Sequence, residues 1–268
     1  MKLSTATEIL REAGIEDALF EARLLFSDIG KIPKTELYGR DAECDSKALY
    51  DAVMRRANRE PIQYIVGNVA FFREEYKVTP DCLIPRPDTE ILVEEVIGRL
   101  PSGKRFIDIC TGSGCIALSI LNNTDSTEAV ALDISSGALA VARENADSLS
   151  LSDRISFIEA DALACSVDGS FYAVVSNPPY VTPKAYECLQ PEIYFEPSIA
   201  FLGGEDGLVF YRTIIEKYKD SLEEGGFFAF EIGYDQADAL RGLAAEHSFK
   251  ITVKEDLSAN PRAVNLYR

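Results

Sequence analysis

The chain has 268 residues, of which 47% are hydrophobic and 26% are charged, as in an ordinary globular protein. Its formal net charge is −17, with 27 basic and 44 acidic residues. This excess of acid argues against a DNA or RNA substrate, because nucleic-acid binders gather Lys and Arg on one face, and it would attract a basic protein partner.

No stretch approaches the ~20 apolar residues of a membrane span, and the N-terminus has no apolar signal core. We therefore expect a cytoplasmic protein without a membrane partner. The six cysteines form no Cys-x-x-Cys pair, and His247 is the single histidine. This pattern predicts reduced, mostly buried thiols and no metal site.

The first 60 residues read as a small helical domain. Apolar spacing predicts helices over 4–13, 17–30 and 45–60, with Ser4 and Asp45 as N-caps of the first and third. Residues 61–80 alternate loosely between apolar and polar side chains around a Gly-Asn break, which predicts a β-hairpin linking two domains.

Residues 81–268 are expected to form an α/β domain. After a helix over 89–100 capped by Asp88, strands alternate with helices and two final strands pair antiparallel. This alternation predicts a doubly wound, mostly parallel, Rossmann-like sheet. The expected strands cover 105–110, 128–134, 155–160, 171–176, 225–233, 250–257 and 263–268, and the helices between them 114–123, 136–149, 207–222 and 235–248.

A glycine-containing turn follows the first of these strands and opens a helix: Cys110, Thr111, Gly112, Ser113 and Gly114. Glycines there let the backbone turn tightly and approach a ligand. Asp133 ends the second strand, where an acid can accept hydrogen bonds from ribose hydroxyls. The alternative is an ordinary helix-capping acid, although Ser135 could cap instead. Asp161 could receive an adenine amino group, and Ala162 would line the ring pocket.

Two cofactor classes compete for this turn. A nicotinamide enzyme would prefer Gly-x-Gly-x-x-Gly, whereas the first glycine is replaced by Cys110 here. Asp108 with Gly112 and Gly114 fits the acidic, glycine-containing pattern of S-adenosylmethionine enzymes, and no Lys or Arg follows to bind phosphate. Acidic surroundings also suit the cationic sulfonium and amino groups. We therefore expect S-adenosylmethionine as cofactor, S-adenosylhomocysteine as product, and no metal.

The fourth strand ends in Asn177, Pro178, Pro179 and Tyr180. Two prolines cannot continue a ladder, so a stiff turn presents the amide and the ring. The Asn177 oxygen and the Pro178 carbonyl could each accept a hydrogen bond from one N–H of a planar NH2 group. The Tyr180 ring could pack against the flat face of that group. An Asn-Pro turn that merely ends a strand is the alternative. The glycine-containing turn of residues 110–114, here named the ligand turn, and Asp133 lie at neighbouring strand ends. Together they favour a methyl-transfer site with Asn177, Pro178 and Tyr180 as catalytic residues.

With these motifs the chain resembles the HemK family, protein-glutamine methyltransferases that act on peptide chain release factors. Asn-Pro-Pro-Tyr is shared with adenine amino-methyltransferases, whereas "IPRPDTE" and "GGEDGLVFYR" are more specific. The resembling segments, in family order, are "EPIQYIVG" (60–67), "LIPRPDTE" (83–90), "GSGCIAL" (112–118), "ALDIS" with "ALAVARENA" (131–146), "VSNPPYV" (175–181), "LGGEDGLVFYR" (202–212) and "EIGYDQ" (231–236).

The resemblance implies methylation of the glutamine in the Gly-Gly-Gln loop of release factors. It implies a helical docking domain (1–60), a hairpin linker (61–80) and a methyltransferase domain (81–268). It also implies cofactor contacts at residues 110–114, Asp133, Ala162 and Asn177, and glutamine contacts at residues 177–180. The family usually has glycine where Cys110 stands.

Two other functions remain to be weighed. An adenine amino-methyltransferase acting on nucleic acid would need a base-flipping route and phosphate contacts, which the charge of −17 opposes. A non-catalytic binding protein on the same fold would have lost its site residues, yet Gly112, Gly114, Asp133 and residues 177–180 are present.

Overall fold

The computed structural model describes residues 1–125 and 127–268, and the chain divides into two compact units. The first unit comprises Met1–Asn68 together with Gln190–Phe195. The second comprises Val69–Leu189 and Glu196–Arg268. Each unit has a hydrophobic core of its own.

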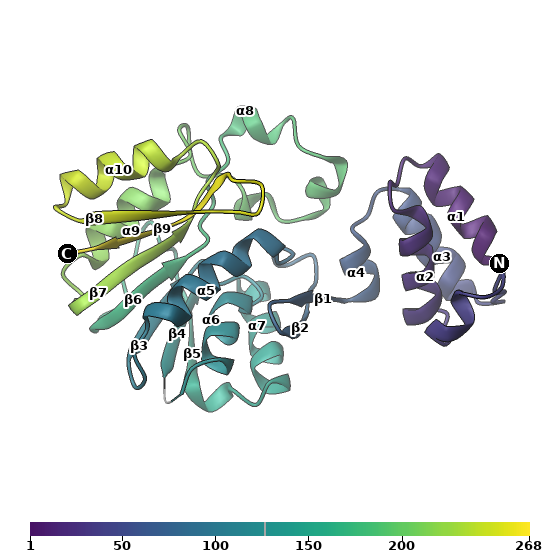
Figure 1. The fold of residues 1–268 in the computed structure, drawn as a ribbon, viewed down its shortest axis with the longest axis horizontal. Coiled ribbons are helices and arrows are strands. Elements are labelled where there is room, and N and C mark those ends of the chain that lie inside the picture. Colours follow the sequence, from purple (N-terminus) through teal and green to yellow (C-terminus); the bar gives the residue numbers. More distant parts are fainter. Residues whose placement is uncertain (126) are drawn as a thin grey trace. The chain divides into compact units, whose positions relative to one another are not determined.

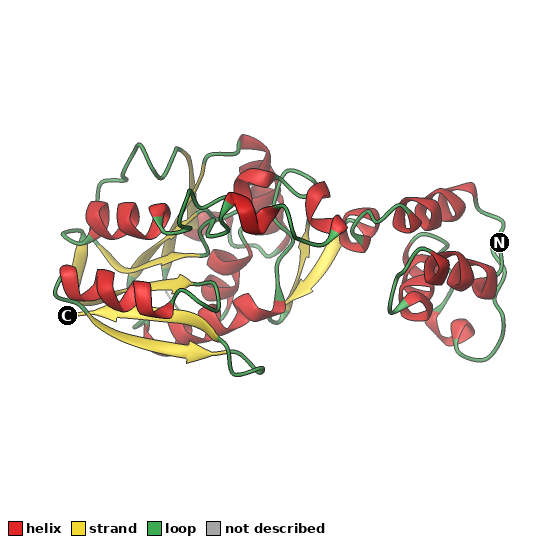
Figure 2. Ribbon diagram, turned by 90° about the horizontal axis from the view of Figure 1, so that it is seen from above, coloured by secondary structure: helices red, strands yellow, loops and turns green. Residues whose placement is uncertain are grey.

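The first unit is helical (Figure 2). Ser46, and not the expected Asp45, caps α3, because its side chain accepts the N–H of Leu49. Ser4 lies inside α1, where it bonds to Asp41 and caps nothing. The elements are α1 (Leu3–Glu12), α2 (Ala18–Asp28), η1 (Lys34–Leu37), α3 (Lys47–Ala57), α4 (Ile62–Val66) and the distant turn η4 (Pro191–Phe195).

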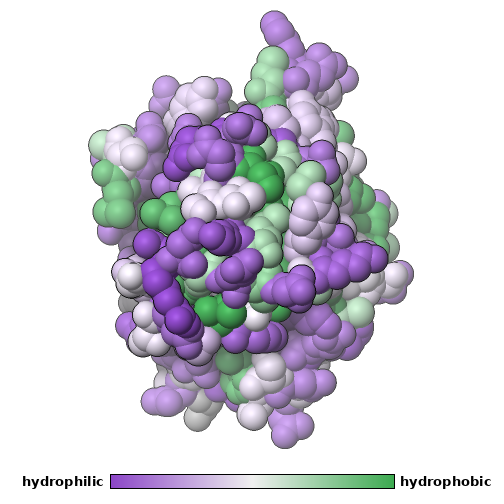
Figure 3. Space-filling model, turned by 90° about the vertical axis from the view of Figure 1, so that its right-hand side faces the viewer, coloured by the Kyte–Doolittle hydropathy of each residue, from purple (hydrophilic) through white to green (hydrophobic). Residues whose placement is uncertain are grey.

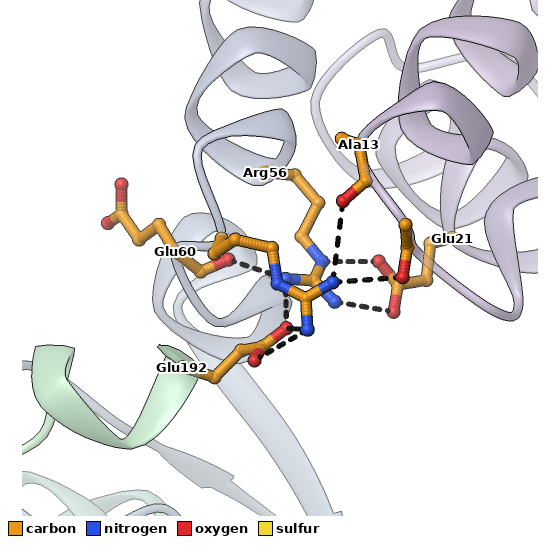
Figure 4. Close-up of polar contacts among 7 residues, drawn as sticks. Ala13, Glu21, Arg56, Glu60 and Glu192 are labelled. Atoms are coloured by element: carbon orange, nitrogen blue, oxygen red, sulfur yellow. Dashed lines mark hydrogen bonds and ion pairs between the residues drawn. The ribbon is translucent and has the colours of Figure 1, made fainter. Parts of the chain in front are cut away.

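A cluster of ion pairs, here named the Arg56 cluster, joins Glu21, Arg56, Arg59 and Glu192 in this unit (Figure 4). Arg56 is only 6% exposed, and its guanidinium donates to both Glu21 and Glu192. Burial acts to raise the pKa of Glu192, but hydrogen bonds from its own backbone and from the two arginines outweigh it and lower that pKa. Guanidinium groups thus hold η4 on helices that lie far from it in the sequence.

The second unit is built on a seven-stranded sheet in the order β5-β4-β3-β6-β7-β9-β8, in which β9 runs antiparallel to both neighbours (Figure 1). The chain starts in the middle and builds outward first on one side and then on the other, so strand order reverses between β3 and β6. The strands are β3 (Arg105–Ile109), β4 (Glu128–Asp133), β5 (Ile155–Glu159), β6 (Phe171–Ser176), β7 (Leu222–Glu231), β8 (Lys250–Glu255) and β9 (Pro261–Tyr267).

Helices cover both faces of this sheet (Figures 1 and 2). Successive strand residues point to opposite faces, so Phe106 packs with the helices of one face and Ile107 with those of the other. The result is the expected doubly wound α/β architecture. The first face carries α5 (Glu90–Arg99), α6 (Cys115–Asn122) and α7 (Ser136–Ser148), and the second carries α9 (Val209–Tyr218) and α10 (Ala237–Glu246).

The short elements of the second unit are 3₁₀ turns and one helical turn in its loops. Asp88 lies in η2, just before α5, and does not cap that helix as expected. The short elements are η2 (Pro87–Thr89), η3 (Ser152–Arg154), α8 (Pro183–Tyr186) and η5 (Ser198–Ala200).

The hairpin is shorter than expected. It consists of β1 (Asn68–Phe71) and β2 (Glu74–Lys77), whereas the residues before it form α4, which ends at Gly67 in the left-handed conformation. The apolar run Ile62–Val66 was wrongly assigned to a strand, because a run that short has no distinctive period. Phe71 and Tyr76 are buried in a core of the second unit.

The face drawn in Figure 3 is mostly hydrophilic, with hydrophobic side chains in small separate areas. No helix among the described residues has the length and apolarity needed to cross a membrane. The same residues contain no group of three or more His, Cys, Asp or Glu placed to hold a metal ion. The expectation of mostly buried cysteines is wrong: Cys82 and Cys115 are buried, whereas Cys165 and Cys188 are exposed.

Candidate active site

Three strand ends bring the expected site residues to one edge of the sheet. Ile109 at the end of β3 pairs with Leu132 on one side and with Ser176 on the other. The ligand turn therefore begins between Asp133 and Asn177. This is the point where strand order reverses, and the carboxyl ends of strands at such a point form a crevice in open α/β sheets.

The ligand turn is held by Asp133. Its carboxylate accepts the N–H of Gly112 at 2.8 Å and that of Ser135 at 2.9 Å. Burial raises the pKa of Asp133, and these N–H groups oppose the rise. Ser135 caps α7 with its own side chain, so Asp133 serves the ligand turn rather than the helix. Cys110 occupies the left-handed region with φ 63°, which explains why glycine suits this position.

A second acid lies beneath the same turn. Asp108 is fully buried and accepts the Thr111 hydroxyl at 2.6 Å. Burial raises the pKa of Asp108 to about 7, against hydrogen bonds from Thr111 and the Ala117 backbone. Among the described residues, its other oxygen and the buried Ser113 hydroxyl have no hydrogen-bond partner. The turn thus covers polar atoms without partners and a carboxyl whose charged form is disfavoured by burial.

A cavity of about 590 Å³ opens beside the ligand turn. This volume lies within the range of small-molecule sites. Asp161 lines it, although one of its oxygens accepts the N–H of Leu163 at 2.8 Å. The expected site residues that line this cavity are Cys110, Gly112, Asp133, Asp161, Ala162, Asn177 and Pro179.

Ile134 and Leu163 also line the cavity and were not expected there. Their side chains are 47% and 38% exposed, which is unusual for aliphatic residues beside a buried sheet. Each directly follows an expected cofactor residue, Asp133 or Ala162. That adjacency was the signal available in the sequence, and it places two apolar surfaces where a planar ring could lie.

A smaller cavity of about 30 Å³ adjoins the first and shares Cys110, Gly112 and Asn177 with it. Thr111 and Ser113 line only the smaller one. Three other expected site residues, Gly114, Pro178 and Tyr180, do not line either of these two cavities within the described chain. Gly114 has a packing reason instead, since a Cβ there would lie 3.1 Å from that of Ala142.

The Asn-Pro-Pro-Tyr turn is surrounded by polar partners. The Asn177 amide nitrogen donates to the Thr89 hydroxyl oxygen at 3.4 Å, and the Tyr180 hydroxyl donates to Glu231 at 3.2 Å. Thr89 also donates to Glu231. Burial raises the pKa of Glu231, against hydrogen bonds from Thr89 and Tyr180 and the charge of Arg262. Sequence reasoning assigned no role to Thr89 or Glu231.

Two glycines lie in close contact with the backbone of the Asn-Pro-Pro-Tyr turn. A Cβ on Gly203 would lie 2.5 Å from the Pro179 carbonyl oxygen, and one on Gly207 would lie 2.3 Å from that of Tyr180. Gln236 donates its amide to the Tyr180 carbonyl at 3.2 Å. Close backbone approach therefore explains the glycines of "LGGEDG", and Gln236 links "EIGYDQ" to the same turn.

The segment Leu83–Glu90 lies on the other side of the site. The Ile84 N–H donates at 2.9 Å to Glu196, whose side chain is buried, and Arg86 pairs with the same carboxylate. Leu83 lines both cavities, and Thr89 lines the smaller. The Ile84 backbone and the Arg86 side chain thus fix this segment to Glu196, with Leu83 and Thr89 in the cavity walls.

Two family models match the chain. Methyltransferase small domain matches residues 87–228, more than half of the chain, and PrmC N-terminal domain matches residues 2–67. In solved structures, the ribosomal protein L11 methylase of Lactobacillus delbrueckii subsp. bulgaricus superposes with a TM-score of 0.52 over 71% of this chain and 83% of its own, at 23% identity. That likeness concerns the fold.

Relatives extend over nearly the whole chain. The release factor glutamine methyltransferase of Caulobacter vibrioides is 37% identical over 97% of this chain and 93% of its own length. The protein of the same name from Thermodesulfovibrio yellowstonii is 38% identical over 92% of each. The match to the PrmC N-terminal domain coincides with the helical unit. The chain belongs to the release factor glutamine methyltransferase family.

Proposed function

We propose that this protein transfers a methyl group from S-adenosylmethionine to the side-chain amide nitrogen of the glutamine in the Gly-Gly-Gln loop of peptide chain release factors, in the cytoplasm. The observation that carries the proposal is the position of Asn177, which follows β6 and lines both cavities. The Asn177 side chain therefore offers a hydrogen-bond acceptor for an NH2 group and also lines a cavity that could hold a methyl donor.

The residues around the larger cavity fit S-adenosylmethionine. Asp133 would accept the ribose hydroxyls, and Ile134 and Leu163 would flank the adenine, with Asp161 and Ala162 at its edge. Residues 110–114 would contact the remainder of the molecule. The unpartnered oxygen of buried Asp108 and the raised pKa of that carboxyl indicate that its charged form is poorly stabilised, and a cationic ligand nearby would stabilise it.

S-adenosylmethionine supplies a methyl carbon activated by its bond to a positively charged sulfur. The chain's own residues hold the acceptor. The Asn177 oxygen and the Pro178 carbonyl each accept a hydrogen bond from one N–H of the glutamine amide. The Tyr180 ring packs against the flat face of that amide. An amide nitrogen is a poor nucleophile, so orientation and two acceptors that raise its electron density contribute most of the rate.

The target glutamine lies in a loop, so the rest of the release factor needs a docking surface. We assign docking to the helical domain of residues 1–60, a linking role to residues 61–80 and chemistry to residues 81–268. Leu19, Phe20, Tyr38 and Tyr50 are large hydrophobic residues that the helical domain exposes. Exposed aromatic residues are common anchors of protein interfaces.

Mass spectrometry of a purified release factor, after incubation with this protein and S-adenosylmethionine, tests the proposal. We expect one added methyl group on the Gly-Gly-Gln peptide. Asn177→Ala should lower turnover at least ~100-fold, because it removes an acceptor that positions the reacting group. Calorimetry should show cofactor affinity changed only modestly.

Asn122→Ala, which removes an exposed amide at the end of α6, is the matched control and should not change turnover. Tyr180→Phe should retain more activity than Tyr180→Ala, since the ring face is the proposed contact. Wild-type turnover by Asn177→Ala would contradict the proposal. Methylation of adenine in nucleic acid with none on the release factor would replace it with the alternative reaction.

A further inference from the structure

A set of side-chain contacts links the Asn-Pro-Pro-Tyr turn to two residues far from it in the sequence. We name Thr89, Asn177, Tyr180 and Glu231 the Glu231 network. Glu231 accepts the Thr89 hydroxyl on one carboxylate oxygen and the Tyr180 hydroxyl on the other. Thr89 in turn faces the amide nitrogen of Asn177, 3.4 Å away. All four residues belong to the second unit.

With Glu231 ionised, as the nearby charge of Arg262 favours, the donors and acceptors of this network leave one arrangement. The carboxylate then only accepts, so the single hydroxyl proton of Thr89 is directed to Glu231. The Thr89 oxygen can then only accept from its other neighbour. That neighbour must present N–H, and the Asn177 amide therefore faces Thr89 with its nitrogen. The oxygen of the same planar amide points to the opposite side.

Burial makes the reversed amide unfavourable. Thr89 and Glu231 are each 2% exposed. A reversed Asn177 would bring its oxygen against the Thr89 oxygen with no proton between them, where little water can intervene. Asn177 itself is partly exposed and lines both cavities. Its oxygen is thus the atom left to accept a hydrogen bond from a ligand.

We propose that Thr89 and Glu231 are positioning residues that orient the Asn177 amide so that its oxygen, and not its nitrogen, meets the substrate NH2 group. This inference rests on the function proposed above. Neither residue touches the reacting atoms, and both act through Asn177. The same carboxylate also holds the Tyr180 hydroxyl, which sets the plane of the ring.

Thr89→Val tests the inference, because it removes the hydroxyl and preserves the size of the side chain. We expect kcat for release-factor methylation to fall about 10–100-fold, with KM for the release factor and Kd for S-adenosylmethionine within about 3-fold of wild type. Thr89→Ser restores the hydroxyl and should recover kcat to within about 3-fold of wild type. In an Asn177→Ala background, Thr89→Val should cause no further loss.

Thr213→Val is the matched control. Thr213 is a partly buried threonine of α9 whose hydroxyl donates to the Val209 carbonyl and which lines neither cavity, so its loss should leave kcat unchanged. If Thr89→Val does not fold, Thr89→Ala removes the same hydroxyl with a smaller side chain. Wild-type kcat in a folded variant without the hydroxyl, or a serine variant as slow as the valine one, would overturn the inference.

A second measurement does not depend on the release factor. The side-chain NH2 protons of Asn177, identified in NMR spectra by their loss in Asn177→Ala, should exchange faster in Thr89→Val than in wild type or Thr89→Ser. Identical exchange in wild type and Thr89→Val would overturn the orientation. A wild-type protein that methylates no release factor would refute the proposed function, and this measurement would still decide the orientation of Asn177.

Discussion

The Arg56 cluster of the helical unit and the ligand turn of the second unit differ in how they accommodate charge that is removed from water. In the helical unit, the Arg56 cluster pairs each guanidinium with carboxylates. In the second unit, Asp108 and Asp133 accept hydrogen bonds from a hydroxyl and from backbone N–H groups, and burial raises the pKa of both. The helical unit also holds nearly as many basic as acidic residues, so most of the net charge lies in the second unit.

The difference separates charge that serves structure from charge that is available to a ligand. A paired buried charge is costly to break, because the remaining partner is left uncompensated. A buried acid without a cationic partner destabilises the fold and stabilises a bound cation. Asp133 lines the cavity where we propose that a cationic cofactor binds, and Asp108 lies beneath the ligand turn beside it.

The largest expected effect comes from breaking the paired charge of the helical unit. Arg56→Met should lower the free energy of unfolding by about 3–5 kcal/mol, because Glu21 loses its buried guanidinium partner and Glu192 loses one of two. Urea denaturation followed by circular dichroism measures this loss. Arg40→Met, which removes an exposed pair with Glu36, should cost no more than about 0.5 kcal/mol. Equal stability of the two variants would refute the structural role.

Replacing Asp108, the buried acid without a cationic partner, should instead raise the free energy of unfolding. The pKa of Asp108 is raised from 3.8 to about 7, so the folded state binds its proton more tightly than the unfolded state, and stability falls as pH rises from about 4 to 7. Asp108→Asn should therefore raise the free energy of unfolding at pH 8 by up to about 4 kcal/mol, from a rise of about 3 in the pKa at ~1.4 kcal/mol per pKa unit.

The stability gain of Asp108→Asn should shrink toward zero as pH falls to about 4, because the wild-type carboxyl is then protonated in both states. Thermal denaturation at a series of pH values measures this. If the Asp108 carboxylate stabilises the bound cofactor, saturating S-adenosylmethionine should also reduce the difference in stability between Asp108→Asn and wild type at pH 8. A gain that is independent of pH would mean that the effect of the substitution is not due to the charge.

Asp133→Ala tests the acid proposed to contact the cofactor. We expect calorimetry to show S-adenosylmethionine binding weakened by about 1–3 kcal/mol, since ribose hydroxyls and the Gly112 N–H lose their acceptor. Glu159→Ala is the matched control, because Glu159 ends the next strand in register with Asp133 and is exposed. An equal loss in both variants would show that strand-end charge in general, and not Asp133, supports binding.

The smallest effect is expected at Cys110, which stands where the family resemblance implies glycine. Cys110→Gly should change the free energy of unfolding by no more than about 1 kcal/mol, because relief of the left-handed backbone offsets the loss of a thiol. Cofactor affinity should be retained. Ala259→Gly, an exposed residue with φ 61°, isolates the backbone contribution. A large loss of affinity confined to Cys110→Gly would give the thiol a direct role in binding.

Local pattern was sufficient for the architecture and for part of the site. Short continuous apolar runs identified the central strands, because helices cover them on both faces, and apolar spacing of 3.6 identified helices between them. The ligand turn, Asp133 and Asn177 could be placed together, since carboxyl ends of parallel strands share one edge of a sheet. Short apolar runs lack a period, and so Ile62–Val66 was assigned wrongly.

The sequence by itself therefore determined the α/β fold, the order of its elements and the strand ends that carry the ligand turn and the Asn-Pro-Pro-Tyr turn. Tertiary structure alone decided which buried partners surround those turns. Thr89 and Glu231 are separated by 142 positions, and Arg56 and Glu192 by 136. Such pairs leave no periodic trace, because hydrogen bonds between distant side chains depend on how helices and strands pack and not on local spacing.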